Sequence, residues 1–356
     1  MRTDLATRAI WRTTRRQDTV TLVLGAWLVL GVFADGWAHF TVPNLESFFT
    51  PWHGALYSGL VAIVGWFVLL ALPGWRAGQS LVGALPTGYQ QGAAGAGLFG
   101  LGGIGDMAWH QVFGVETGID ALLSPTHLLL FAGGLLILTS PLRARWSAER
   151  LGPADRWVAT GSATLAMALA GFALIYTSAF AAPRPVEAFT RLPENHPAHE
   201  ATELPVVAGL AGYLVTTAVL VVPMLFLLQR RSLPLGGATL LTAALAGLSV
   251  AVVDFPAAAT AGALGAAIGA LLADLLIART APVEHRWTLP VTAAVVMLAV
   301  WSGQLTGLAL TAGLGWPVEL WSGVILLSAA VAGLLGALAA TPRVRRAITS
   351  QAGGSW

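Results

Sequence analysis

Residues 106–127 read DMAWHQVFGVETGIDALLSPTH, a polar stretch between two apolar runs. Asp106 and His110 are four residues apart, so on a helix they lie on one face, one turn from each other. Ser124 is a typical N-cap and the proline after it a typical first helical residue, which places His127 in the first turn of the next helix. The three side chains are therefore expected to converge across a helix-loop-helix hairpin.

The same arrangement occurs earlier in the chain. Asp35 and His39 are again four residues apart, and His53 is the third residue after Thr50 in a Thr-Pro-Trp-His sequence. The aspartates of the two copies are 71 residues apart, as are the first histidines, and the second histidines are 74 apart. Because two copies at a nearly constant offset contain four of the seven histidines, the pattern predicts an internal structural repeat.

The composition predicts a membrane protein. Of the 356 residues, 56% are hydrophobic and 10% are charged, whereas soluble domains are typically about 25% charged. The chain contains no cysteine, which excludes disulfides, cysteine zinc sites and thiolate nucleophiles. Histidines and carboxylates remain as the groups that can carry chemistry, and no pattern typical of nucleic-acid binding is present.

Apolar runs of about 20 residues predict an all-α, polytopic integral membrane helix bundle. With a cytoplasmic N-terminus, 17 of the 19 basic residues fall in cytoplasmic segments, and only Arg184 and Arg191 lie outside. The positive-inside rule supports this orientation, so we expect a multi-pass protein of the plasma membrane with both termini cytoplasmic. About ten transmembrane helices are expected, near 19–40, 52–73, 89–113, 124–142, 156–181, 204–228, 234–254, 256–278, 288–313 and 317–341.

This topology places both Asp/His sets near the extracytoplasmic face. Residues 1–142 would form a metal-binding unit of four helices, and residues 143–356 a six-helix unit of unknown role. If the two hairpins pack side by side, the sets would lie together as two mononuclear sites or one dinuclear centre. Six aromatic side chains flank them and predict either an apolar substrate pocket or an interfacial belt: Trp37, Phe48, Phe49, Trp52, Trp109 and Phe113.

Two histidines and one carboxylate form a facial metal-binding set that suits iron, copper, zinc or manganese. Ionisable groups near the end of a span are costly to bury, and a bound cation would offset that cost for a whole set. Two alternatives remain. Each Asp-His pair could staple a helix end, or the paired histidines could ligate a haem, which leaves the repeated aspartate without a role.

The second motif resembles the copper-binding stretch of the membrane-embedded C subunit of particulate methane monooxygenase and ammonia monooxygenase. The matching residues are Asp106, Trp109, His110, Gln111, Glu116, Thr117, Ser124, Pro125, Thr126 and His127. The resemblance covers about the first four helices, and it implies that Asp106, His110 and His127 bind copper.

The first motif resembles the second copper set of that family, with aspartate in place of asparagine. Asp35, His39 and His53 fall on its ligand positions. The resemblance implies oxygen-dependent hydroxylation of a small apolar substrate, with electrons from membrane quinol and with cupredoxin-like or other partner subunits. Copper is the metal it implies, with iron and zinc as alternatives.

Further polar residues are expected on the same side of the membrane. Glu116 and Asp120 are candidates for hydrogen bonding to the metal ligands or for proton delivery, with a solvated loop face as the alternative. His196, His199 and Glu200 are candidates for an accessory metal site. A solvated polar loop is the favoured interpretation there, because the proline between the two histidines opposes a helix.

Two other functions fit the same ligands. A transporter or delivery protein for copper or another metal would need a polar path inward, for which the sequence offers Asp254, Asp274 and Gln304. A membrane scaffold could instead hold a structural metal or haem without turnover. The sequence leaves the oligomeric state open.

Overall fold

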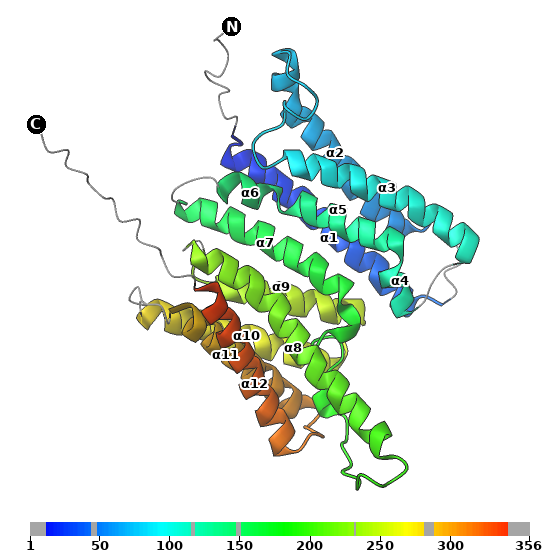
Figure 1. The fold of residues 1–356 in the computed structure, drawn as a ribbon, viewed down its shortest axis with the longest axis vertical. Coiled ribbons are helices and arrows are strands. Elements are labelled where there is room, and N and C mark those ends of the chain that lie inside the picture. Colours follow the sequence, from blue (N-terminus) through cyan, green and yellow to red (C-terminus); the bar gives the residue numbers. More distant parts are fainter. Residues whose placement is uncertain are drawn as a thin grey trace, which may run out of the picture.

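The computed structural model describes residues 12–43, 48–114, 118–146, 151–230, 233–280 and 288–340. These residues form an all-α bundle whose helices run roughly alongside one another (Figure 1). The α-helices are α1 (Arg15–Thr41), α2 (Pro51–Arg76), α3 (Gln90–Phe113), α4 (Ile119–Leu123), α5 (Pro125–Leu138), α6 (Ser140–Trp146), α7 (Pro153–Ala173), α8 (His199–Gln229), α9 (Gly237–Val252), α10 (Ala257–Thr280), α11 (Thr288–Thr311) and α12 (Val318–Ala339).

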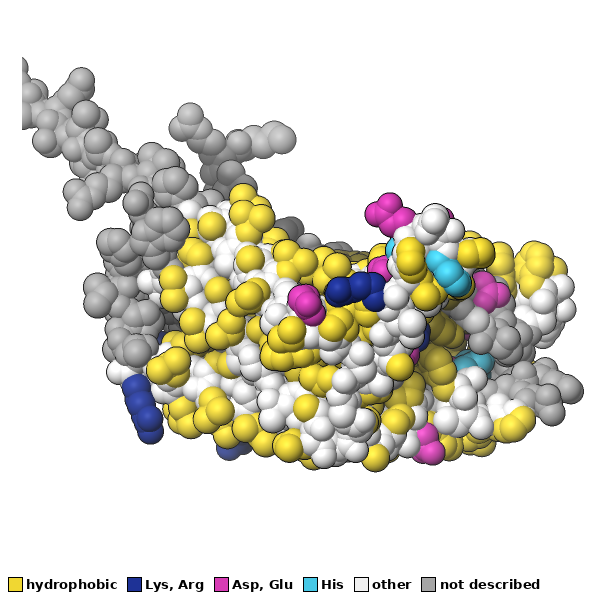
Figure 2. Space-filling view, turned by 90° about the horizontal axis from the view of Figure 1, so that it is seen from below, with side chains coloured by type: hydrophobic (Ala, Val, Ile, Leu, Met, Phe, Trp, Pro, Cys, Tyr) yellow, Lys and Arg dark blue, Asp and Glu magenta, His cyan; other side chains and the backbone are white. Residues whose placement is uncertain are grey.

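Seven helical segments in the described part of the chain are long and apolar enough to cross a membrane. They are α1, α2, α5 together with α6, α8, α10, α11 and α12. Hydrophobic side chains cover much of the molecular surface, and the exposed histidines in this view lie toward one side of it (Figure 2). The prediction of an all-α protein is therefore confirmed, and the length and composition of these seven segments support the prediction of a membrane protein.

Three helix boundaries differ from those expected. The fourth predicted span is divided into α5 and α6 just before Pro141, whose ring and missing N–H interrupt a helix. The fifth ends at Ala173 rather than near 181. There the hydroxyl of Ser178 accepts hydrogen bonds from the backbone N–H groups of Phe180 and Ala181, which stabilises non-helical chain. The sixth begins at His199 instead of 204.

Two large apolar clusters form the core. One is built mainly from α1, α2, α3 and α5, and the other mainly from α8 to α12. Helix α7 lies between them, since Leu169 and Phe172 pack in the first cluster and Met167 in the second. Residues beyond 142 thus contribute to the packing of the predicted metal-binding unit.

Glycines permit the close approach of α3 and α5. A Cβ atom at Gly95 would lie 2.6 Å from the carbonyl oxygen of Gly133, and one at Gly133 would lie 2.6 Å from that of Gly95. Small residues of this kind let helix backbones touch in membrane proteins. This contact fixes the second hairpin, because α3 carries Asp106 and His110 while α5 carries His127.

A buried polar network lies near the start of α1, at the opposite end of that helix from Asp35. Asp18 is fully buried, forms an ion pair with Arg145 and accepts a 2.6 Å hydrogen bond from the Tyr89 hydroxyl. Arg145 also pairs with Asp155 at 3.3 Å. Because every one of these charges has a partner, the network ties α1, α6 and α7 together without offering an open site. Asp18 belongs to neither of the repeated Asp/His motifs.

Candidate metal centre

The two hairpins begin their second helices in the same way. The hydroxyl of Thr50 accepts a hydrogen bond from the backbone N–H of His53 at 3.1 Å, and Ser124 accepts one from His127 at 3.3 Å. In each case proline is the first helical residue. The predicted N-caps are confirmed, and they place the second histidine of each set in a first helical turn.

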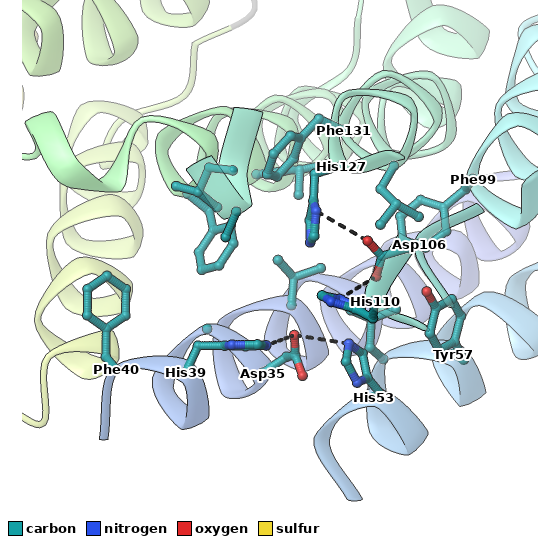
Figure 3. A pocket seen from close by; sticks show the side chains of 18 of the residues that line it. Asp35, His39, Phe40, His53, Tyr57, Phe99, Asp106, His110, His127 and Phe131 are labelled. Atoms are coloured by element: carbon teal, nitrogen blue, oxygen red, sulfur yellow. Dashed lines mark ion pairs between the residues drawn. The ribbon is translucent and has the colours of Figure 1, made fainter. Parts of the chain in front are cut away.

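In the first set, one carboxylate oxygen faces both histidines. Asp35 Oδ2 lies 3.7 Å from His39 Nε2 and 3.6 Å from His53 Nε2 (Figure 3). One ligand atom from each residue lies within 4.8 Å of the others, so the three atoms can surround a single ion. The Thr50 hydroxyl lies 3.3 Å from His53 Nδ1, which orients the ring with Nε2 toward the aspartate.

In the second set, the two carboxylate oxygens face different histidines. Asp106 Oδ2 lies 3.3 Å from His110 Nε2, and Oδ1 lies 3.4 Å from His127 Nδ1. The hydroxyl of Thr126 donates a 3.0 Å hydrogen bond to Oδ1. Ser124 Oγ lies 2.7 Å from His127 Nδ1, so this nitrogen is shared between the cap and the aspartate. The predicted convergence of both sets is confirmed.

Both sets line one cavity, which measures about 840 Å³ when its open mouth is included. The six Asp and His side chains lie together in Figure 3, and Phe48 bridges the sets with ring centroids 4.6 Å from His53 and 6.2 Å from His110. The remaining wall is mostly apolar and includes Phe99, Leu130, Phe131, Leu169 and Phe172. Such a combination of convergent polar groups and apolar walls is typical of a small-molecule site.

The aromatic residues of this wall differ from most of those expected. Phe49 and Phe113 are 79% and 66% exposed and do not line the cavity. Tyr57 and Phe131 line the cavity instead, each four residues after the second histidine of its set. That spacing puts each ring on the same helix face as the histidine, so the repeat contained a signal that would have found them.

The other predicted polar residues lie outside the cluster of six. Asp120 is exposed on α4, with its carboxylate against Gly118 at the cavity wall, and Glu116 lies outside the described residues. Burial, with the negative charge of Asp120 adding to it, raises the pKa of the Tyr176 phenol, which also lines the cavity.

The candidate accessory site consists of groups that serve local turns. His196 is exposed, and its Nδ1 accepts a hydrogen bond from the backbone N–H of Ala198 at 3.1 Å. His199 Nδ1 lies 2.9 Å from the carbonyl oxygen of Leu192, which matches a donated hydrogen bond. Glu200 is exposed in the first turn of α8. An accessory metal site here stays a prediction.

The spacing of the donor atoms suits a metal ion. Two ligands about 2.1 Å from a metal lie about 3.4 Å apart at a tetrahedral angle, and in the first set the Asp35-His distances are 3.7 and 3.6 Å. Among the described residues, Asp35, His39 and His53 are the group whose ligand atoms converge closely enough for a single ion, while the two oxygens of Asp106 face separate histidines at 3.3 and 3.4 Å. Comparison of the chain with known protein families, curated proteins and solved structures found no match. The geometry of the cavity therefore carries the functional argument.

Proposed function

We propose that this chain is a copper-binding integral membrane protein of monooxygenase type, which oxidises a small apolar substrate with dioxygen. One observation carries the proposal: two Asp/His/His sets from separate hairpins converge on a single cavity whose remaining wall is apolar. The resemblance of both motifs to copper-binding stretches of the membrane monooxygenases supports copper, while iron and zinc suit the same donors.

The residues around each set would hold the ligands in place before the metal binds. Thr50 orients His53, and Thr126 restrains the carboxylate of Asp106. Hydrogen bonds of this kind fix ring orientation and raise metal affinity. A bound copper would supply the redox chemistry with dioxygen, and the protein would supply ligand geometry and a confined space.

The apolar wall would select the substrate. Burial of each methylene group of a ligand contributes about 0.8 kcal/mol, so a short hydrocarbon gains binding energy from phenylalanine and leucine without needing a polar contact. A cavity with metal ligands on one part of its wall and apolar side chains on the rest suits hydroxylation of an apolar molecule better than capture of a hydrated ion.

The proposed topology has ten crossings in the plasma membrane, with both termini cytoplasmic and the cavity near the extracytoplasmic face. Helices α3, α7 and α9 would add to the seven apolar spans. Membrane quinol would deliver electrons, and cupredoxin-like or other subunits would complete the assembly. The distribution of arginine along the sequence supports this orientation.

Metal transport is the rival function. Of its candidate path residues, Asp274 and the amide nitrogen of Gln304 make hydrogen bonds, while Gln304 Oε1 is buried without a hydrogen-bond partner in the described part of the chain. Asp274 accepts hydrogen bonds from the backbone N–H and the hydroxyl of Thr239, and Gln304 donates one to the carbonyl oxygen of Ala179. Uptake of labelled copper into proteoliposomes, without oxygen consumption, would favour transport over oxidation.

Metal content provides the first test. Wild-type protein in lipid nanodiscs would be compared with His39→Ala and His110→Ala by mass spectrometry. If each set holds its own copper, each variant should lose about half of the copper. Unchanged copper in both variants would overturn the proposed sites. Bound metal that raises thermal stability without any oxygen or substrate dependence would instead identify a structural scaffold.

A further inference from the structure

The hydroxyl of Tyr57 is a polar group of the cavity that the Asp/His sets do not use. Tyr57 lies on α2 one turn after His53, with the two ring centroids 6.1 Å apart and the planes at 27°. Its other side packs edge-on against Phe99 at 6.4 Å. Within the described residues, no hydrogen bond involves its hydroxyl, and the residue lines the cavity.

Gly103 fixes where this hydroxyl lies. A Cβ atom at position 103 would be 2.6 Å from the tyrosine ring and 2.7 Å from its hydroxyl oxygen. Gly103 precedes Asp106 by three residues, so both lie on one face of α3. In Figure 3 the hydroxyl end of Tyr57 points toward the side of Asp106. The hydroxyl therefore lies against α3, on the side of the cavity that carries Asp106.

The two hairpins differ at this position of the repeat. Phe131 follows His127 by four residues, as Tyr57 follows His53, and both rings line the cavity. Only the first hairpin has a hydrogen-bond donor at this position. A ligand in the cavity thus meets a hydroxyl on the side of Tyr57 and an apolar surface on the side of Phe131.

We propose that the Tyr57 hydroxyl donates a hydrogen bond to a small anionic or oxygen-donor ligand held between the two Asp/His sets. A divalent copper with one carboxylate and two neutral imidazoles keeps a net positive charge, which attracts such a ligand, and three protein donors leave coordination positions open. The phenol then orients the ligand with its polar end toward α2. This inference rests on the proposed copper sites.

Azide is a suitable probe, because its binding to copper(II) produces an absorption band that can be titrated. Full-length protein in nanodiscs would be loaded with copper(II), and its metal content measured before the titration. Tyr57→Phe removes a single oxygen atom. Tyr213→Phe makes the same change in a tyrosine of α8 that does not line the cavity, and serves as the matched control.

We expect Tyr57→Phe to keep its copper and to bind azide roughly tenfold more weakly, the usual effect of losing one hydrogen bond to a charged group. Tyr213→Phe should bind azide as the wild type does. Equal azide affinity in Tyr57→Phe and wild type would overturn the inference and leave the copper sites standing. Loss of copper in Tyr57→Phe would also overturn it, because the tyrosine would then support the metal itself. A wild-type protein that takes up no copper would overturn the proposed function and the inference together.

Discussion

The two hairpins share a sequence pattern but arrange their aspartates differently. In the first, a single oxygen of Asp35 faces both histidines. In the second, Asp106 presents one oxygen to His110 and the other to His127, and it is only 1% exposed. The first set thus resembles a ligand cluster around one point, whereas the carboxylate of the second bridges two rings. The comparison teaches that a repeated motif need not give two equivalent sites.

The largest expected effect comes from Asp106→Asn, with Asp35→Asn as the matching change in the first hairpin. Asp35→Asn can keep one oxygen at the point that faces both histidines, so we expect copper affinity at the first set to fall only about tenfold through loss of charge. Asp106→Asn must lose one of two oxygens in use. We expect the copper affinity of the second set to fall by more than roughly 100-fold, the upper range for losing a hydrogen bond to a metal ligand.

Competition with a copper chelator measures both affinities, and alanine at each position serves as the control that removes every oxygen. Equal losses in the two asparagine variants would break the distinction between the hairpins.

Thr126→Val tests the hydrogen bond that only the second hairpin has, since Trp52 occupies the corresponding place in the first. The substitution keeps the shape of the side chain and removes the donor to Asp106. We expect copper affinity at the second set to fall roughly 10- to 100-fold. Chelator competition in a His39→Ala background isolates that set, and Thr126→Ser should retain wild-type affinity.

Gly103→Ala tests the contact between the hairpins. The added methyl would collide with Tyr57, so we expect a loss of about 1–3 kcal/mol in the free energy of unfolding. Gly100→Ala lies on the same helix with open space around it, and there alanine should stabilise the helix by up to about 1 kcal/mol. Unfolding in mixed micelles compares the two variants. A similar outcome for both would show that Tyr57 is not held against α3.

Trp37→Phe should produce the smallest effect. The indole N–H of Trp37 donates to Asp254 Oδ1 at 3.4 Å, a long bond that links the first hairpin to the turn between α9 and α10. The second hairpin has Ala108 at the corresponding position. We expect a loss of less than about 1 kcal/mol, measured by thermal unfolding. A larger loss would mean that the first hairpin depends on the C-terminal helices for its stability.

Much of the site follows from local sequence. The apolar runs determine that the chain forms membrane-compatible helices, and Thr50 and Ser124 determine where two of them begin. The four-residue spacing alone brings each aspartate to its first histidine. These relations involve neighbours within about one helical turn, so they depend little on the rest of the molecule.

Tertiary structure decided what the local patterns could not. Three features depend on how distant helices pack. Both sets line one cavity, Phe172 from α7 contributes to its wall, and the two oxygens of Asp106 face different histidines. So does the buried pairing of Asp18 with Arg145, 127 residues away in sequence. Helix-helix contacts are set by the shapes of whole surfaces, including the close approach at Gly95 and Gly133, and residue spacing does not encode them.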